Sequence, residues 1–152
     1  MLLPKDRRLR YHLGEELLKL GEYQEAVDFY EGLRQRWPKD PRAAFSLAKA
    51  YTYNRAFEDA ARSLQEALHL DPKASADILE VGDVFYDLKE YSRAISLYQK
   101  ALAVREDAQA RYKLALSYKE TGQPEKARQE AAKALAGDPE NRDFQALVKT
   151  LN

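Results

Sequence analysis

A repeat of 34 residues runs along this chain and constrains its fold more than any other feature. Small residues return at matched positions: Ala48 lies 34 residues after Gly14, and Gly82 lies 34 residues after Ala48. Ala115 follows 33 residues later. The four copies occupy residues 7–40, 41–74, 75–107 and 108–141. A fixed period of about 20 to 50 residues is typical of repeat architectures. We therefore expect stacked copies of one small unit.

Each copy contains two apolar stripes with helical spacing. In the second copy, Ala44, Leu47 and Tyr51 fall at i, i+3 and i+7, and a second stripe runs over residues 57–68. Spacing of this kind indicates amphipathic helices, and Pro72 ends the second one because proline disfavours helix in the residue before it. Ala and Leu are abundant, whereas Val, Ile and Thr are few. The sequence therefore predicts an all-α protein built from helical hairpins.

These positions resemble a known family. The pattern Leu-Gly or Leu-Ala, Gly, aromatic, Ala, aromatic, Ala-Leu and Pro at this period is similar to that of tetratricopeptide repeats, and it covers residues 7–141. The resemblance implies one domain over residues 1–152. It also implies a right-handed α-solenoid of stacked helix-turn-helix hairpins, whose first helices line a concave groove that binds peptides or proteins.

Departures from the family pattern mark places where the packing differs. The glycine between the two helices is replaced by Arg55 and Lys89, which must adopt at some cost a backbone geometry that glycine accepts freely. The large aromatic residue early in the first helix and the boundary proline are also replaced in some copies. The residues at those positions are Arg10, Ala44, Ile78, Arg111 and, in place of the third proline, Glu106.

The two ends of the repeat array need polar caps, because each hairpin covers only its neighbours. Phe144, Leu147, Val148 and Leu151 form one stripe, which predicts a capping helix over residues 142–151. At the amino end, Leu2, Leu3 and an exposed Trp37 favour self-association.

The first helices supply the expected binding groove. An apolar ladder of Tyr11, Phe45, Leu79 and Tyr112 occupies one position in all four copies. Apolar surface rimmed by charge is typical of a binding site, but helical aromatic stripes also pack as core, and both interpretations stay open. The peptide-binding residues we expect are Tyr11, Glu15, Phe45, Lys49, Tyr53, Leu79, Asp83, Tyr86, Asp87 and Tyr112.

Charge in this groove is uneven. An acidic stripe runs along the third first helix through Glu80, Asp83, Asp87 and Glu90, with lysines on neighbouring copies. It favours a basic or amphipathic partner segment. The alternative is ion pairing between repeats, Lys49 with Asp83 and Lys113 with Glu80, which contributes only about 0 to 1 kcal/mol per exposed pair.

Members of the resembled family that clamp chaperone C-terminal carboxylates need Lys, Asn and Arg at set places, because cationic and amide donors must converge on the carboxylates. The matching positions here are Tyr11, Glu15, Ser46, Ala76 and Glu80. Moving the frame by one repeat keeps only part of the basic set, at Lys49 and Lys113. We expect no binding of that type.

Other function classes find little support. The chain has no Cys and zero net charge, and His12 beside Glu15 and Glu16 has no further ligand. We therefore expect no enzyme activity, no cofactor, no metal and no membrane or nucleic-acid binding, although Arg7, Arg8 and Arg10 form a short basic segment. The charged start predicts a soluble, cytoplasmic protein. The expected function is that of a non-catalytic adaptor for another protein, and the alternative is a self-associating scaffold.

Overall fold

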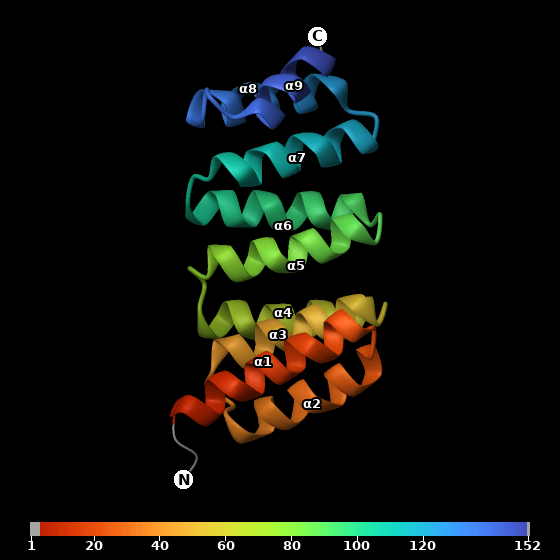
Figure 1. Ribbon diagram of the computed structural model, residues 1–152, viewed down its shortest axis with the longest axis vertical. Coiled ribbons are helices and arrows are strands. Elements are labelled where there is room, and N and C mark those ends of the chain that lie inside the picture. The colour runs from red at the N-terminus through yellow and green to blue at the C-terminus, as the bar shows by residue number, and fades with distance from the viewer. Residues whose placement is uncertain (1–3, 152) are drawn as a thin grey trace. The chain divides into compact units, whose positions relative to one another are not determined.

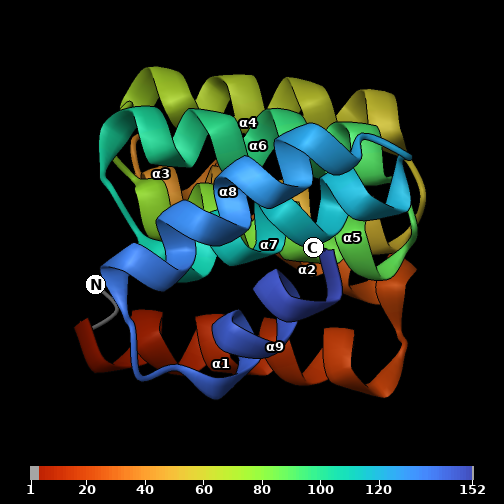
Figure 2. The same ribbon diagram turned by 90° about the horizontal axis from the view of Figure 1, so that it is seen from above.

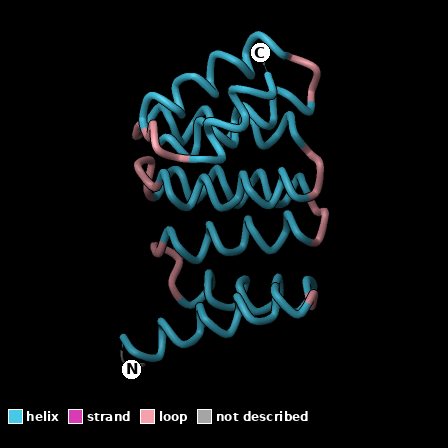
Figure 3. Tube along the Cα trace, turned by 45° about the horizontal axis from the view of Figure 1, so that its top comes forward, coloured by secondary structure: helices cyan, strands magenta, loops and turns pink. Residues whose placement is uncertain are grey.

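The computed structural model describes residues 4–151, and within them every regular element is an α-helix (Figures 1 and 3). The all-α prediction is confirmed. The helices are α1 (Pro4–Leu20), α2 (Tyr23–Arg36), α3 (Pro41–Tyr53), α4 (Phe57–Leu70), α5 (Ser75–Asp87), α6 (Tyr91–Val104), α7 (Ala108–Glu120), α8 (Pro124–Gly137) and α9 (Arg142–Leu151). They form two compact units, Met1–Pro72 and Lys73–Asn152.

The ends of the helices follow from local chemistry. The Asp40 carboxylate accepts a hydrogen bond from the Arg42 amide at 3.1 Å, and Pro41 opens α3 with no amide proton to satisfy. Asp107 caps α7 in the same way, through the Ala110 amide at 2.8 Å. At the inner turns, Arg55 and Lys89 have φ angles of 59° and 63°. The expected strained geometry at these two positions is confirmed.

Two glycines let an aromatic ring approach a helix backbone. In the Met1–Pro72 unit, a Cβ atom on Gly14 would overlap the Tyr30 ring. In the Lys73–Asn152 unit, a Cβ atom on Gly82 would lie 3.0 Å from Cε1 of Tyr98. Each tyrosine on a second helix therefore passes beneath the first helix of its own hairpin, and its hydroxyl reaches the far side.

The carboxyl-terminal segment forms α9, which packs against the α7–α8 hairpin and lies nearest the viewer together with α8 in Figure 2. Phe144 and Leu147 are buried, and Leu147 packs with Ala115 and Ala131. At the other end, Leu2 and Leu3 lie outside the described residues. Trp37, expected to be exposed, is half-buried against Tyr11, with the ring centroids 6.4 Å apart.

Two departures from the family pattern compensate for each other. Arg111 replaces the early aromatic residue, and its guanidinium pairs with Glu106, which replaces the boundary proline. The same guanidinium pairs with Glu130, a buried carboxylate on α8. The buried charge on α8 is thus balanced by α7.

None of the helices in the described part of the chain has both the length and the apolar character needed to cross a bilayer.

Candidate functional site

A pocket of about 290 Å³ opens on the Lys73–Asn152 unit, among α5, α6 and α7. It is lined by Asp83, Tyr86, Asp87, Tyr98, Gln109, Tyr112, Lys113 and Leu116. Four of these residues belong to the binding set expected from the sequence: Asp83, Tyr86, Asp87 and Tyr112. The structure therefore brings together most of the set's members in this unit.

Helical spacing places the lining residues. Asp83, Tyr86 and Asp87 lie at i, i+3 and i+4 on α5, so their side chains share one face. The residues from α7 follow the same rule, because Gln109, Tyr112, Lys113 and Leu116 lie at i, i+3, i+4 and i+7. The pocket is the space between these two faces, with the Tyr98 hydroxyl at one wall.

Asp83 is held by partners inside the protein. The Tyr98 hydroxyl donates a hydrogen bond of 2.9 Å to its Oδ1, and the Lys113 ammonium forms an ion pair with its Oδ2. Burial, followed by the charge of Asp83, raises the pKa of the Tyr98 phenol well above its ordinary value. Asp83 and Lys113 therefore neutralise each other and shape the pocket.

A similar arrangement occurs in the Met1–Pro72 unit. The Tyr30 hydroxyl donates a hydrogen bond of 3.2 Å to Oε1 of Glu15, and Lys49 pairs with that oxygen at 2.8 Å. Glu15 belongs to α1 and Lys49 to α3, so the pair joins first helices of consecutive repeats. In each unit one carboxylate of the expected binding set, Glu15 or Asp83, thus forms an ion pair with a lysine of the next repeat.

Two of the three tyrosines that line the pocket are supported by neighbouring rings. Tyr86 meets Tyr91 edge to face, with centroids 5.2 Å apart, and Tyr112 packs on Phe144 of α9 at 5.0 Å. Both rings are half-buried, and their hydroxyls make no hydrogen bond with other described residues. Each therefore presents a fixed ring and an available polar group.

The pocket's unbalanced charge is negative. Asp87 lines the pocket, and Glu120 lies one helical turn beyond the lining residue Leu116 on α7. Both are exposed, and neither forms an ion pair within the described part of the chain. Burial, and next the carboxylate of Glu120, raise the pKa of the Tyr86 phenol. The spacing from Leu116 to Glu120 puts this carboxylate on the same face of α7 as the lining residues.

Tyr11 and Phe45 do not form part of an accessible surface. Their side chains are 1% and 3% exposed, so the structure assigns them to the core, which was the alternative interpretation of the ladder. Leu79 is half-buried. Tyr53 is also half-buried, and its ring stacks on Tyr23 with centroids 5.4 Å apart.

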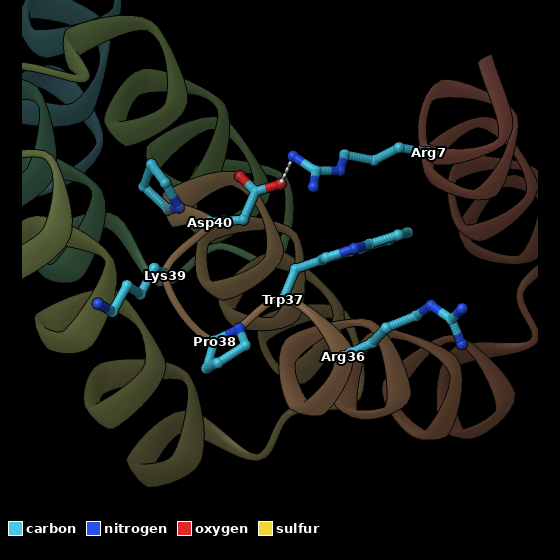
Figure 4. A pocket seen from close by; sticks show the side chains of 7 residues that line it. Arg7, Arg36, Trp37, Pro38, Lys39 and Asp40 are labelled. Carbon is cyan, nitrogen blue, oxygen red and sulfur yellow. Dashed lines mark hydrogen bonds and ion pairs between the residues drawn. The ribbon is translucent and has the colours of Figure 1, made fainter. Parts of the chain in front are cut away.

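A second pocket, of about 510 Å³, was missed by sequence reasoning. It lies in the Met1–Pro72 unit at the turn between α2 and α3, where the amino end of α1 approaches (Figure 4). Its lining residues are Arg7, Arg36, Trp37, Pro38, Lys39, Asp40 and Pro41. The available signal was the basic Arg36-Trp37-Pro38-Lys39 turn, but nothing in the spacing places Arg7 beside it.

Among the described residues, no group of three or more His, Cys, Asp or Glu side chains is placed to hold a metal ion.

Comparison with known proteins shows what the chain is similar to. Hsp70-Hsp90 organizing protein 1 of Glycine max is 33% identical over 89 residues, which is 59% of this chain and 16% of that protein. This chain thus spans about one sixth of the length of that relative. A thermophilic repeat protein of Thermus thermophilus has 25% identity and a TM-score of 0.72, with 93% of this chain and 79% of that chain covered.

A kinesin light chain protein of Podospora anserina with TPR-like repeats has a TM-score of 0.73 at 17% identity, over 99% of this chain and 87% of that chain, and this likeness shows the fold alone. Tetratricopeptide repeat profiles match residues 11–75, 45–111 and 85–151. Since these matches cover most of the sequence and agree with its helical hairpins, the chain belongs to the tetratricopeptide repeat family.

Proposed function

We propose that this chain is a non-catalytic protein–protein interaction module, which binds a peptide or helical segment of a partner protein in the pocket among α5, α6 and α7. The observation that carries the proposal is the combination of two supported tyrosine rings with two carboxylates that lack a basic partner. The family supports the general function of an interaction adaptor.

The chemistry of the pocket favours a cationic side chain in the bound segment. A lysine or arginine over the Tyr86 or Tyr112 ring gains a cation–π interaction, and it also meets the carboxylates of Asp87 and Glu120. Leu116 and the ring faces supply apolar contact for neighbouring side chains of the same segment. The expected ligand is therefore a basic, amphipathic segment.

A chaperone-tail ligand is disfavoured in this protein. The name of the soybean relative refers to Hsp70 and Hsp90. In this chain, however, the positions that would hold a carboxylate clamp include Glu15, which is engaged with Lys49, and Ser46, which is buried. A terminal carboxylate would meet like charge at Glu15.

The test is the affinity of a labelled amphipathic peptide of leucine and lysine, measured by fluorescence anisotropy. The double variant Asp87→Asn, Glu120→Gln is expected to weaken binding about tenfold, because two exposed charge pairs are lost. A peptide in which every lysine is replaced by glutamine is expected to bind the unaltered protein just as weakly.

The matched control removes two carboxylates elsewhere. Glu58 and Glu140 are exposed and form no ion pair with other described residues, so Glu58→Gln with Glu140→Gln makes the same change in net charge. Equal loss of affinity in both double variants would mean that total charge, not the pocket, determines binding, and the proposal would be wrong.

Self-association remains a second candidate function. It is favoured by large apolar side chains left exposed on α1, Leu9, Leu13 and Leu20. Sedimentation equilibrium tests it, because the average mass of an associating chain rises with protein concentration.

A further inference from the structure

The pocket at the α2–α3 turn is built around Trp37. The indole lies between the side chains of Arg7 and Arg36 (Figure 4). The guanidinium carbon of Arg7 is 4.7 Å from the ring centroid, and that of Arg36 is 5.9 Å from it. Two cations thus flank one aromatic ring at a half-buried site.

Among the residues that the structure describes, Asp40 is the one carboxylate that lines this pocket, and it is already engaged. Oδ2 of Asp40 accepts a hydrogen bond of 3.0 Å from the Tyr11 hydroxyl and faces Arg7 at 3.5 Å. Its Oδ1 accepts the Arg42 amide at 3.1 Å, the capping bond that begins α3. Asp40 therefore serves the fold, and it balances at most one of the two guanidinium groups.

Hydrogen-bond donors in the pocket lack acceptors. Arg36 is exposed and pairs with no carboxylate among the residues that the structure describes. The indole N–H of Trp37 donates no hydrogen bond within that same part of the chain. Guanidinium and indole N–H groups only donate, so an incoming group that completes this site must accept hydrogen bonds and carry negative charge.

We propose that this pocket binds an acidic side chain, Asp or Glu, of an extended segment from a partner protein. The carboxylate pairs with Arg36 and Arg7 beside the indole edge, and the rigid rings of Pro38 and Pro41 pack against the segment's neighbouring side chains. The pocket lies in the Met1–Pro72 unit, so the proposal does not depend on the basic ligand proposed for the Lys73–Asn152 unit.

A protein segment fits this pocket better than a nucleic acid does. Single strands bind through bases stacked on open aromatic faces. Here the guanidinium groups of Arg7 and Arg36 lie against the Trp37 ring, where a base would have to stack. The chain also has zero net charge, so it has no long-range attraction for a polyanion. One or two carboxylates match the small number of unpaired donors.

Trp37 is the single tryptophan of the sequence, so its fluorescence reports directly on this pocket. The probe is a blocked peptide of sequence Glu-Glu-Leu-Glu-Glu, titrated into the full chain at low salt. The expected result is a saturable change in tryptophan emission that weakens as salt rises. Arg36→Gln is expected to lower the affinity about threefold, and Arg36→Gln with Arg7→Gln about tenfold.

Controls separate this site from general charge effects. Arg142→Gln with Arg55→Gln removes two exposed arginines from other places, and it is expected to leave the titration unchanged. Because Arg36 makes no ion pair in the described chain, the single variant Arg36→Gln is expected to fold. It therefore still tests the site if the double variant unfolds. The proposal is overturned if the peptide Gln-Gln-Leu-Gln-Gln binds with the same affinity as the acidic peptide, or if the control variant loses as much affinity as the Arg36 and Arg7 variant. It is also overturned if oligo-dT competes for the site with a higher affinity than that of the acidic peptide.

Discussion

At the residue scale, Arg55 and Lys89 hold backbone angles that side chains with a Cβ atom rarely adopt, with φ of 59° and 63°. The equivalent turns elsewhere use Gly21 and Gly122, with φ of 82° and 69°. An L-residue in the left-handed region costs about 1 to 2 kcal/mol, of which glycine is free. Two of the four hairpin turns are therefore strained.

Lys89→Gly is expected to stabilise the protein by about 0.5 to 1 kcal/mol. The relief of strain exceeds the extra entropy that glycine gives the unfolded chain. Arg55→Gly is expected to act in the same direction. The free energy of unfolding, measured by urea denaturation, checks both.

The control is Lys100→Gly, at an exposed position inside α6 where the helix is regular. That change is expected to destabilise by about 1 kcal/mol, the usual cost of glycine in a helix. If Lys89→Gly lowers stability as Lys100→Gly does, the turn is not strained in solution.

Sequence spacing predicted these two turns, but it did not predict which members of the aromatic ladder stay accessible. Tyr11 and Tyr112 occupy the same repeat position, yet Tyr11 is buried and Tyr112 lines a pocket. The difference arises from neighbours that the repeat pattern does not contain. Tyr11 lies against Trp37 and under the Arg42 guanidinium, whereas Tyr112 leans on Phe144 and keeps one side open.

At the scale of elements, α9 connects stability to the binding pocket. Phe144 and Leu147 are buried against the α7–α8 hairpin, and the Phe144 ring contacts Tyr112, a lining residue of the α5–α7 pocket. A terminal helix that covers the last hairpin thereby fixes the position of a ring in the site.

Phe144→Ala is expected to destabilise the protein by about 3 kcal/mol, because it leaves a cavity beneath Tyr112. It is also expected to lower the affinity for the lysine-containing peptide several-fold under conditions where the variant is still folded, because the Tyr112 ring loses the Phe144 ring that supports it. Urea denaturation and fluorescence anisotropy measure the two effects.

Val148→Ala is the matched comparison, because Val148 lies on α9 but is only half-buried. A cost of about 1 kcal/mol and unchanged peptide affinity are expected there. Unchanged affinity in folded Phe144→Ala would show that α9 does not position Tyr112.

Helix positions followed the sequence closely, because the same apolar spacing and the same stop signals return in each copy. Asp40-Pro41 and Asp107 begin helices through capping bonds that are local in sequence. The pocket around Trp37 depends instead on Arg7, 30 residues away along the chain, being brought to the α2–α3 turn. Contacts of this kind follow from how a first helix packs on the next hairpin, which periodicity alone does not specify.

At the scale of the whole molecule, zero net charge conceals local imbalance. The pocket of the Lys73–Asn152 unit is lined by Asp87, a carboxylate that has no ion pair in the described chain. The pocket of the Met1–Pro72 unit is lined by Arg36, a guanidinium group that likewise has none. Net charge governs long-range attraction, whereas these pockets act at contact distance. A balanced composition is therefore compatible with two sites of opposite preference.

Self-association is the prediction that belongs to the whole chain. Leu9, Leu13 and Leu20 on α1 are 68%, 52% and 73% exposed. At about 100° per residue they lie within about 40° of one another around the helix, so they form a single apolar stripe. An exposed stripe of large apolar side chains favours burial against a second copy of the chain.

The average mass in sedimentation equilibrium is expected to rise with protein concentration and to stay monomeric for Leu9→Gln, Leu13→Gln, Leu20→Gln. Those side chains are already exposed, so the variant is expected to fold, and circular dichroism checks this. Val104→Gln replaces an exposed apolar residue on α6 and is expected to leave association intact. A mass that stays monomeric for the unaltered chain at high concentration, or association that persists in the triple variant, would contradict a role for this stripe and leave partner binding as the function that the chain supports.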